Sequence, residues 1–120
     1  MSKQILIVDD CSTTRKLLSI ILKGRGYATI AAENGIDALE KLAQHAVDLV
    51  VTDLNMPQMD GLELIRTIRG NADMQNLPVV MVTTESDEMD KKRGIEMGAS
   101  AYLTKPVTKD RLAYEVAKLL

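Results

Sequence analysis

The sequence predicts an α/β fold in which a doubly wound parallel sheet is covered by helices on both faces. Two observations support this fold class. Short apolar runs rich in Val and Ile recur along the chain, and segments with helical periodicity separate them. The chain has 120 residues and shows no linker, repeat or low-complexity tract. We therefore expect one domain, residues 1–120, made of five successive βα units.

The predicted strands are short and apolar on both faces. This pattern is typical of buried parallel strands, because helices cover both sides of such a sheet. The β-branched residues in several of the runs also favour the extended conformation. The expected strands are Ile5–Val8, Tyr27–Ala32, Leu49–Val51, Val79–Val82 and Ala101–Leu103.

Between the strands, apolar residues recur three and four positions apart, as they do along one face of a helix. Glycine ends several of these segments, and Thr108 is expected to cap the last one. The fourth segment, expected from Ser86 to Gly98, has the weakest apolar stripe. The stripes of the other segments are Thr14, Leu17, Leu18 and Ile21; Ala38, Leu39, Leu42 and Ala43; Leu62, Ile65 and Ile68; and Leu112, Val116 and Leu119.

Composition and charge exclude several classes of protein. The formal net charge is −2, and the one basic run, 91–93, follows acidic residues, so no nucleic-acid-binding face is expected. No apolar run approaches the ~18 residues of a membrane helix. The chain enters its first strand without room for a signal peptide, and Cys11, the only cysteine, cannot form an internal disulfide. We expect a cytoplasmic protein that does not associate with membranes.

Polar residues stand at the points where the predicted strands end. Ligands of such folds bind beyond the carboxyl ends of the parallel strands, and the residues found there are Asp9, Asp10, Asp53, Thr83 and Lys105. Carboxylates placed close together repel one another unless a cation neutralises them, and oxygen ligands suit Mg²⁺ or Mn²⁺. A single acid at a strand end is better explained as a helix cap, but the five positions together predict a metal site.

The segment after the third strand reads Asp53-Leu54-Asn55-Met56-Pro57-Gln58-Met59-Asp60-Gly61. Together with Asp9-Asp10, Thr83 and Lys105-Pro106, it resembles the receiver domain of bacterial two-component response regulators, the CheY-like group, and the resemblance covers the whole chain. This resemblance implies a flavodoxin-like (βα)5 sandwich whose five-stranded parallel sheet has the order 2-1-3-4-5. It also implies a protein that is not an enzyme and that catalyses only its own phosphoryl transfer and autodephosphorylation.

The resemblance assigns roles to the residues at the strand ends. Asp53 resembles the phosphorylated aspartate, and Asp10 and Asp53 resemble direct ligands of Mg²⁺. Asp9 resembles a ligand that acts through water, and the backbone carbonyl of Asn55 resembles the third protein ligand. Lys105 resembles the lysine that pairs with a phosphoryl oxygen. These roles agree with the chemistry of phosphoryl transfer, which depends on an in-line nucleophile, positioning and charge neutralisation.

Other positions resemble those that respond to phosphorylation. Thr83 resembles the switch hydroxyl that closes onto the phosphoryl group, and Tyr102 resembles the aromatic residue whose rotamer follows it. Asn55 and Glu85 resemble the pair that tunes phosphoryl lifetime in fast-resetting chemotaxis regulators. The alternative for Glu85 is that it only favours the start of a helix. The Lys105-Pro106 bond is expected to be cis.

The resemblance also implies partners. The donor would be a phosphohistidine on a histidine kinase, and the output would be a protein contact, since no effector domain follows Leu120. The flagellar motor, a histidine phosphotransfer relay and another signalling protein all remain open as targets. We expect a monomer, with a dimer on phosphorylation left open. The expected output surface is Ser86–Gly98, Ala101–Thr104 and Thr108–Leu120. On this surface, Met89 and Tyr102 are the expected apolar contacts, and Lys91, Lys92 and Lys109 form the polar rim. The alternative for Met89 is that it is a core residue.

Two other classes of protein remain as alternatives. A phosphohydrolase with an aspartyl-phosphate intermediate needs a second acid two residues after the nucleophile, where this chain has Asn55. A flavin carrier needs a phosphate-binding loop and flanking aromatic residues, and this chain has neither.

Two residues depart from the family pattern, which often has a bulky residue at Cys11 and Phe at Val107. We interpret Cys11 as a packing residue at a helix start, with a redox switch as the alternative. His45, the sole histidine, is expected at the surface because it has no evident partner.

Overall fold

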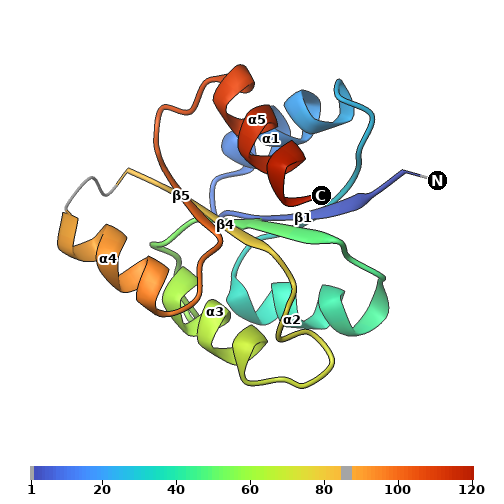
Figure 1. The fold of residues 1–120 in the computed structure, drawn as a ribbon. Coiled ribbons are helices and arrows are strands. Elements are labelled where there is room, and N and C mark those ends of the chain that lie inside the picture. Colours follow the sequence, from blue (N-terminus) through green and yellow to red (C-terminus); the bar gives the residue numbers. More distant parts are fainter. Residues whose placement is uncertain (1, 85–87) are drawn as a thin grey trace.

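The computed structural model describes residues 2–84 and 88–120, and strands alternate with helices along this part of the chain (Figure 1). The strands are β1 (Gln4–Val8), β2 (Ala28–Ala32), β3 (Leu49–Thr52), β4 (Val79–Thr83) and β5 (Ala101–Thr104). The helices are α1 (Ser12–Lys23), α2 (Gly35–Gln44), α3 (Gly61–Arg69), α4 (Glu88–Glu96) and α5 (Lys109–Leu119). None of the helices in the described residues has the length and apolar character needed to cross a bilayer.

The strands form one parallel sheet with the order β2-β1-β3-β4-β5. Strand β1 lies between β2 and β3, so that Ile7 is opposite Ala31 on one side and Val51 on the other. Helices α1 and α5 cover one face of the sheet, and α2, α3 and α4 cover the opposite face (Figure 1). The predicted doubly wound fold and its strand order are therefore confirmed.

An apolar core lies on each face of the sheet. Successive side chains of a strand point to opposite faces. In β1, Leu6 and Val8 accordingly join the core under α2 and α3, whereas Ile5 and Ile7 join the core under α1 and α5. Because both faces are buried, the strands need no alternation of apolar and polar residues, which explains the uninterrupted apolar runs of the sequence.

Two of the predicted helical stripes are wrong in detail. In α1, Leu18 is buried as predicted, but Leu17 is 54% exposed although it was expected in the same stripe, and Leu22, which the stripe did not include, is fully buried. In α2, Ala38 is fully buried whereas Ala43 is exposed. The sheet covers a narrower arc of each helix than a four-position stripe describes, so residues at the edge of the stripe reach solvent.

Polar side chains cap three of the helices. Asn34, Asp60 and Thr108 each accept a hydrogen bond from the backbone N–H three residues later, at 2.8, 2.9 and 3.1 Å. The cap predicted at Thr108 is thus confirmed. The start predicted for the fourth helix, at Ser86, lies outside the described residues, and the helix ends before Gly98, which has a φ of +111°.

Candidate functional site

Three carboxylates meet at the carboxyl edge of the sheet. Asp9 and Asp10 follow β1 and Asp53 follows β3, and one oxygen of each lies within 4.8 Å of the others. The sheet itself holds the backbone there, because the N–H of Asp9 donates to Ala32 and the N–H of Asp53 donates to Val8. Asp9 and Asp53 are buried and Asp10 is exposed, so the cluster opens to solvent on one side.

Short hydrogen bonds orient the two buried carboxylates. The backbone N–H of Cys11 donates to Asp9 Oδ1 at 2.9 Å, and the N–H of Leu54 donates to Asp53 Oδ1 at 2.8 Å. Lys105 Nζ donates to the remaining oxygens, to Asp9 Oδ2 at 2.9 Å and to Asp53 Oδ2 at 3.4 Å. A single ammonium group is therefore shared by two carboxylates and lies closer to Asp9.

The electrostatics of the cluster follow from this sharing. Burial raises the pKa of the Asp53 carboxyl; the Lys105 ammonium opposes the rise, and the Asp9 carboxylate adds to it. Burial by itself would lower the pKa of Lys105, but its hydrogen bond to Asp9 and the negative charges of Asp53 and Asp9 raise the pKa overall. The cluster places three carboxylates around one ammonium group, so Lys105 by itself does not compensate their negative charge.

This uncompensated charge fits a divalent cation. The donors of the cluster are carboxylate oxygens, the ligand type that Mg²⁺ prefers. The exposed Asp10 leaves the site accessible from solvent, which suits a cation that keeps some of its water ligands. The residues present therefore fit the magnesium site that the sequence predicts.

The ends of β4 and β5 complete this edge of the sheet. Thr83 is fully buried and lies opposite Thr104 in the sheet, and its carbonyl accepts the N–H of Lys105 at 2.7 Å. This bond fixes the start of the turn that carries the Lys105 side chain. The Lys105-Pro106 bond is cis, as predicted.

Tyr102 lies inward on β5 with only 9% of its surface exposed. Its ring rests against Gly94 of α4, where an added Cβ would come within 3.2 Å of Tyr102 Cδ2. No pattern in the sequence indicates this contact, because a glycine in a weakly periodic helix does not identify its neighbour.

The segment from Asp53 to Gly61 is a compact loop whose last residue has to be glycine. A Cβ on Gly61 would lie 2.3 Å from the backbone oxygen of Asp53, and the Gly61 N–H donates to Leu54 at 2.8 Å. Gln58, with a φ of 69°, is the non-glycine residue of this loop with positive φ. Asn55 is exposed and follows Asp53 by two residues in this loop. Two positions of the motif thus have structural roles: Gly61 allows the loop to close, and Asp60 caps α3.

The remaining predicted residues lie as follows. Glu85 is outside the described residues. Cys11 is exposed immediately before α1, so its interpretation as a packing residue is wrong: within residues 2–84 and 88–120, its side chain is left open to solvent. His45 is exposed after α2, as expected, and Met89 is 67% exposed and is not a core residue. Sequence reasoning missed Arg15, whose guanidinium donates to the backbone oxygen of Asp9 at 2.6 Å.

Comparison with known proteins agrees with this geometry. The model of the response regulator receiver domain family matches residues 5–117. Among solved structures, the chemotaxis protein CheY4 of Vibrio cholerae is 31% identical, with 100% of both chains covered and a TM-score of 0.94. The receiver domain of a signal transduction histidine kinase from Syntrophus aciditrophicus is 39% identical, covers 99% of this chain and 90% of its own, and has a TM-score of 0.92.

A response regulator receiver protein from Pseudomonas putida is 31% identical, with 98% of each chain covered and a TM-score of 0.92. The family match spans nearly the whole chain, and the acid cluster is of the kind that binds Mg²⁺ in receiver domains. The chain therefore belongs to the response regulator receiver domain family of two-component signalling.

Proposed function

We propose that this receiver domain takes a phosphoryl group on Asp53 from a histidine kinase and signals by contact with another protein. The observation that carries the proposal is the setting of Asp53, a buried carboxylate that shares the Lys105 ammonium with Asp9. Receiver domains accept phosphoryl groups from histidine kinases and are phospho-acceptor modules rather than enzymes. This family property argues against the phosphohydrolase alternative.

In the proposed reaction, Asp53 is the nucleophile. A carboxylate oxygen forms a bond to phosphorus while the P–N bond of the donor phosphohistidine breaks. The leaving imidazole nitrogen keeps the bonding electron pair and takes up a proton. The hydrogen bond from the Leu54 N–H fixes the plane of the Asp53 carboxylate before the transfer. Lys105 then pairs with one phosphoryl oxygen, and the Thr83 hydroxyl donates to another.

The proposed metal ligands are Asp10 and Asp53 directly, Asp9 through water, and the backbone carbonyl of Asn55. When bound, Mg²⁺ or Mn²⁺ would neutralise negative charge on the phosphoryl oxygens. The chain prepares this site with its own hydrogen bonds, since the Cys11 N–H and Lys105 each hold one oxygen of Asp9. The metal would thus add to a set of carboxylates that is already oriented.

The lifetime of the phosphoryl group is proposed to be seconds to minutes. Asn55 is exposed two residues after Asp53, and its side chain is proposed to help to place an attacking water. Glu85, the second residue of this proposal, lies outside the described residues. Timed dephosphorylation of Asp53 checks the proposal, and persistence of the phosphoryl group beyond an hour would refute it.

The output surface is proposed to be formed by α4, β5 and α5. A hollow of about 450 Å³ on this surface is lined by residues that include Lys91, Tyr102 and Arg111. The similarity to a chemotaxis protein supports a chemotaxis target, and the similarity to the receiver of a histidine kinase supports a relay to a histidine phosphotransfer protein. Transfer of label from the phosphorylated domain to a histidine phosphotransfer protein would favour the relay.

The test of the central proposal is labelling by acetyl phosphate with Mg²⁺, measured as the mass gain of one phosphoryl group. We expect labelling of the wild type, loss of labelling with EDTA and loss in Asp53→Asn. Asp60→Asn is the matched control, because Asp60 is an acid of the same loop that caps α3. If Asp53→Asn is labelled as well as the wild type, the proposal is wrong.

A further inference from the structure

Arg15 extends from helix α1 back to the strand end that carries the acid cluster. Its backbone N–H belongs to the helix, where it donates to the Cys11 carbonyl at 3.0 Å, and its guanidinium Nη1 donates to the Asp9 carbonyl at 2.6 Å. Long side chains of a helix point toward its N-terminus, which explains how Arg15 extends past the first turn. The side chain therefore joins α1 to the residue that follows β1.

The position of Arg15 is not explained by the stability of α1. A cation near the start of a helix opposes the helix dipole, whose positive end lies there. The first turn of α1 also holds no acid that would pair with Arg15. The side chain is half-buried, and within the residues that the structure describes its hydrogen-bond partner is the Asp9 carbonyl. The contact with Asp9 is thus the one that accounts for an arginine here.

Each hydrogen-bonding group of Asp9 is held by a different residue. Its N–H donates to Ala32 of β2, Oδ1 accepts the Cys11 N–H, and Oδ2 accepts Lys105 Nζ. Arg15 holds the remaining group, the backbone carbonyl oxygen. Asp9 is only 2% exposed, so water has little access to a group that loses its partner. The Asp9 carbonyl therefore depends on Arg15.

The exposed acid of the cluster, Asp10, lacks such contacts. Its side chain has no hydrogen bond or ion pair within residues 2–84 and 88–120. The direction of its Cα–Cβ bond follows from the peptide units on either side, because each peptide unit is planar and rigid. Arg15 holds the first unit through the Asp9 carbonyl, and the Cys11 N–H holds the second through Asp9 Oδ1. The guanidinium thus helps to determine where the Asp10 carboxylate points.

From these contacts we propose that Arg15 is a positioning residue of the metal site. Through the Asp9 carbonyl it fixes the peptide unit that joins Asp9 to Asp10, and it thereby orients the Asp10 carboxylate for a divalent cation. This role of Arg15 rests on the proposed function of Asp10 as a metal ligand. A guanidinium has no acceptor that could bind the cation, and its own positive charge repels it.

Orientation and charge have opposite effects on the affinity for Mg²⁺. If Arg15 acted only through its charge, its removal would strengthen Mg²⁺ binding, because a positive charge near the carboxylates would be lost. If Arg15 orients Asp10, its removal weakens binding, since the loss of a group that supports metal ligands by hydrogen bonds typically costs roughly ten- to a hundredfold in affinity. The affinity for Mg²⁺ alone therefore distinguishes the two roles, without a measurement of phosphorylation.

The experiment measures Mg²⁺ binding to the full chain by isothermal titration calorimetry, with no phosphoryl donor. Arg15→Met removes the donor and the charge but keeps an unbranched side chain, and we expect it to weaken binding roughly tenfold. Lys16→Met is the matched control, because Lys16 is the exposed neighbour on α1 and has no hydrogen bond or ion pair in the described part of the chain. It should change the affinity less than about twofold.

The possible results separate the role of Arg15 from the proposed metal site. If Arg15→Met binds Mg²⁺ as tightly as the wild type or more tightly, the role of Arg15 is wrong and the metal site stands. If the wild type binds no Mg²⁺, both are wrong. Equal weakening by Lys16→Met would also overturn the role of Arg15. Circular dichroism checks folding, and Arg15→Gln, whose shorter side chain suits a half-exposed position, should weaken binding likewise if Arg15→Met does not fold.

The ¹³C signal of the Asp9 carbonyl provides a second readout in the metal-free protein. Hydrogen bonding shifts the signal of a carbonyl carbon downfield. Arg15→Met should therefore move the Asp9 signal upfield, and Lys16→Met should leave it in place. An Asp9 signal that does not move in Arg15→Met would show that the guanidinium does not hold this carbonyl in solution, and it would overturn the proposal.

Discussion

Helices α3 and α4 have the same length, nine residues each, but they are held to the sheet in different ways. Helix α3 is capped by Asp60 and buries Leu64, Ile65 and Ile68 completely. In α4, Gly94 is buried, whereas Met89 and Ile95 are 67% and 46% exposed. Helix α3 therefore contributes several side chains to the core, whereas α4 packs against the sheet with few buried side chains. Local stability is expected to differ accordingly, with α4 opening more readily than α3.

The largest expected difference concerns an isoleucine in each helix. Ile65→Ala should lower the free energy of unfolding by about 3 kcal/mol, because it leaves a cavity in the core. Ile95→Ala makes the same chemical change at an exposed position and should alter stability by less than about 0.5 kcal/mol. Chemical denaturation with urea measures both values. Similar losses in the two variants would show that α4 is packed as firmly as α3.

The second comparison concerns the glycines of the two helices. Gly61→Ala places its Cβ 2.3 Å from the backbone oxygen of Asp53 and should cost roughly 2 kcal/mol, since backbone must move. Gly94→Ala meets the edge of the Tyr102 ring at 3.2 Å, and the better helix propensity of alanine, about 1 kcal/mol, should offset that contact. Thermal unfolding of the two variants checks this order. The comparison fails if Gly94→Ala proves the more damaging substitution.

The third comparison concerns two arginines of α3. Arg69 donates to the carbonyl oxygens of Gly98 and Leu77, each at 2.7 Å, and burial lowers its pKa. Arg69→Met should cost about 1.5 kcal/mol because these carbonyls lose a charged donor. Hydrogen exchange at the end of α4 should also quicken. Arg66→Met is the control: the Arg66 side chain is exposed and has no hydrogen bond or ion pair in the described residues, so little change is expected.

The smallest expected effect is a pH dependence of stability that comes from Asp53, which follows the strand before α3. Burial raises the pKa of Asp53, so the folded state binds this proton more tightly than the unfolded chain does. Its contribution to stability is therefore greatest below about pH 4, the usual pKa of an aspartate, and falls as the pH rises through the folded pKa.

Without divalent ions, the free energy of unfolding of Asp53→Asn should fall less with rising pH than that of the wild type. Thr83→Ser, at the end of the strand before α4, should show the same fall as the wild type. Unfolding free energies of both variants across this pH range provide the measurement. If the free energy of unfolding of Asp53→Asn falls with pH as it does in the wild type, another acid causes the pH dependence.

Much of the fold was predictable because the signals for it are local. Apolar runs such as Ile5–Val8 predicted the strands, and the acids after them predicted the cluster, since parallel strands bring their carboxyl ends to one edge. The contacts that the sequence did not indicate join distant segments. Arg69 reaches Gly98, and the Tyr102 ring rests on Gly94, yet neither pair has a spacing or periodicity that marks it.

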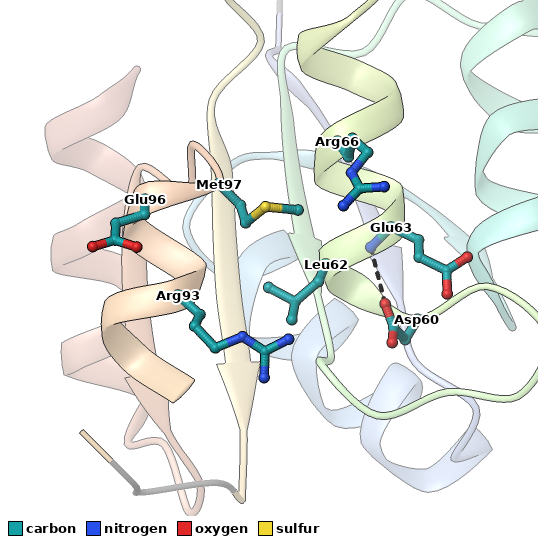
Figure 2. Close-up of a pocket in the computed structure, with 7 residues that line it drawn as sticks. All are labelled: Asp60, Leu62, Glu63, Arg66, Arg93, Glu96 and Met97. Carbon is teal, nitrogen blue, oxygen red and sulfur yellow. Dashed lines mark hydrogen bonds between the residues drawn. The ribbon is translucent and has the colours of Figure 1, made fainter. Parts of the chain in front are cut away.

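Local sequence patterns also do not indicate which single side chains are exposed or where a hollow forms between two helices. Leu17 fits a helical stripe, but only the packed sheet shows that this part of α1 reaches solvent. Cys11 precedes a helix, and only the structure shows that its side chain is exposed. The hollow between α3 and α4 is lined by side chains from distant segments, such as Leu62 and Met97, and no spacing along the chain indicates it (Figure 2).

The Arg69 guanidinium also determines what kind of movement is open to α4. It ties Gly98, just beyond the end of the helix, to the end of α3 at 2.7 Å. A helix that is anchored at one end tilts about that end and does not slide along its axis. With nine residues, α4 is roughly 13 Å long, so a tilt of about 10° carries its first turn through roughly 2 Å while its last turn stays in place. A disturbance that tilts α4 would thus displace the first turn most and leave the end beside Gly98 and α3 in place.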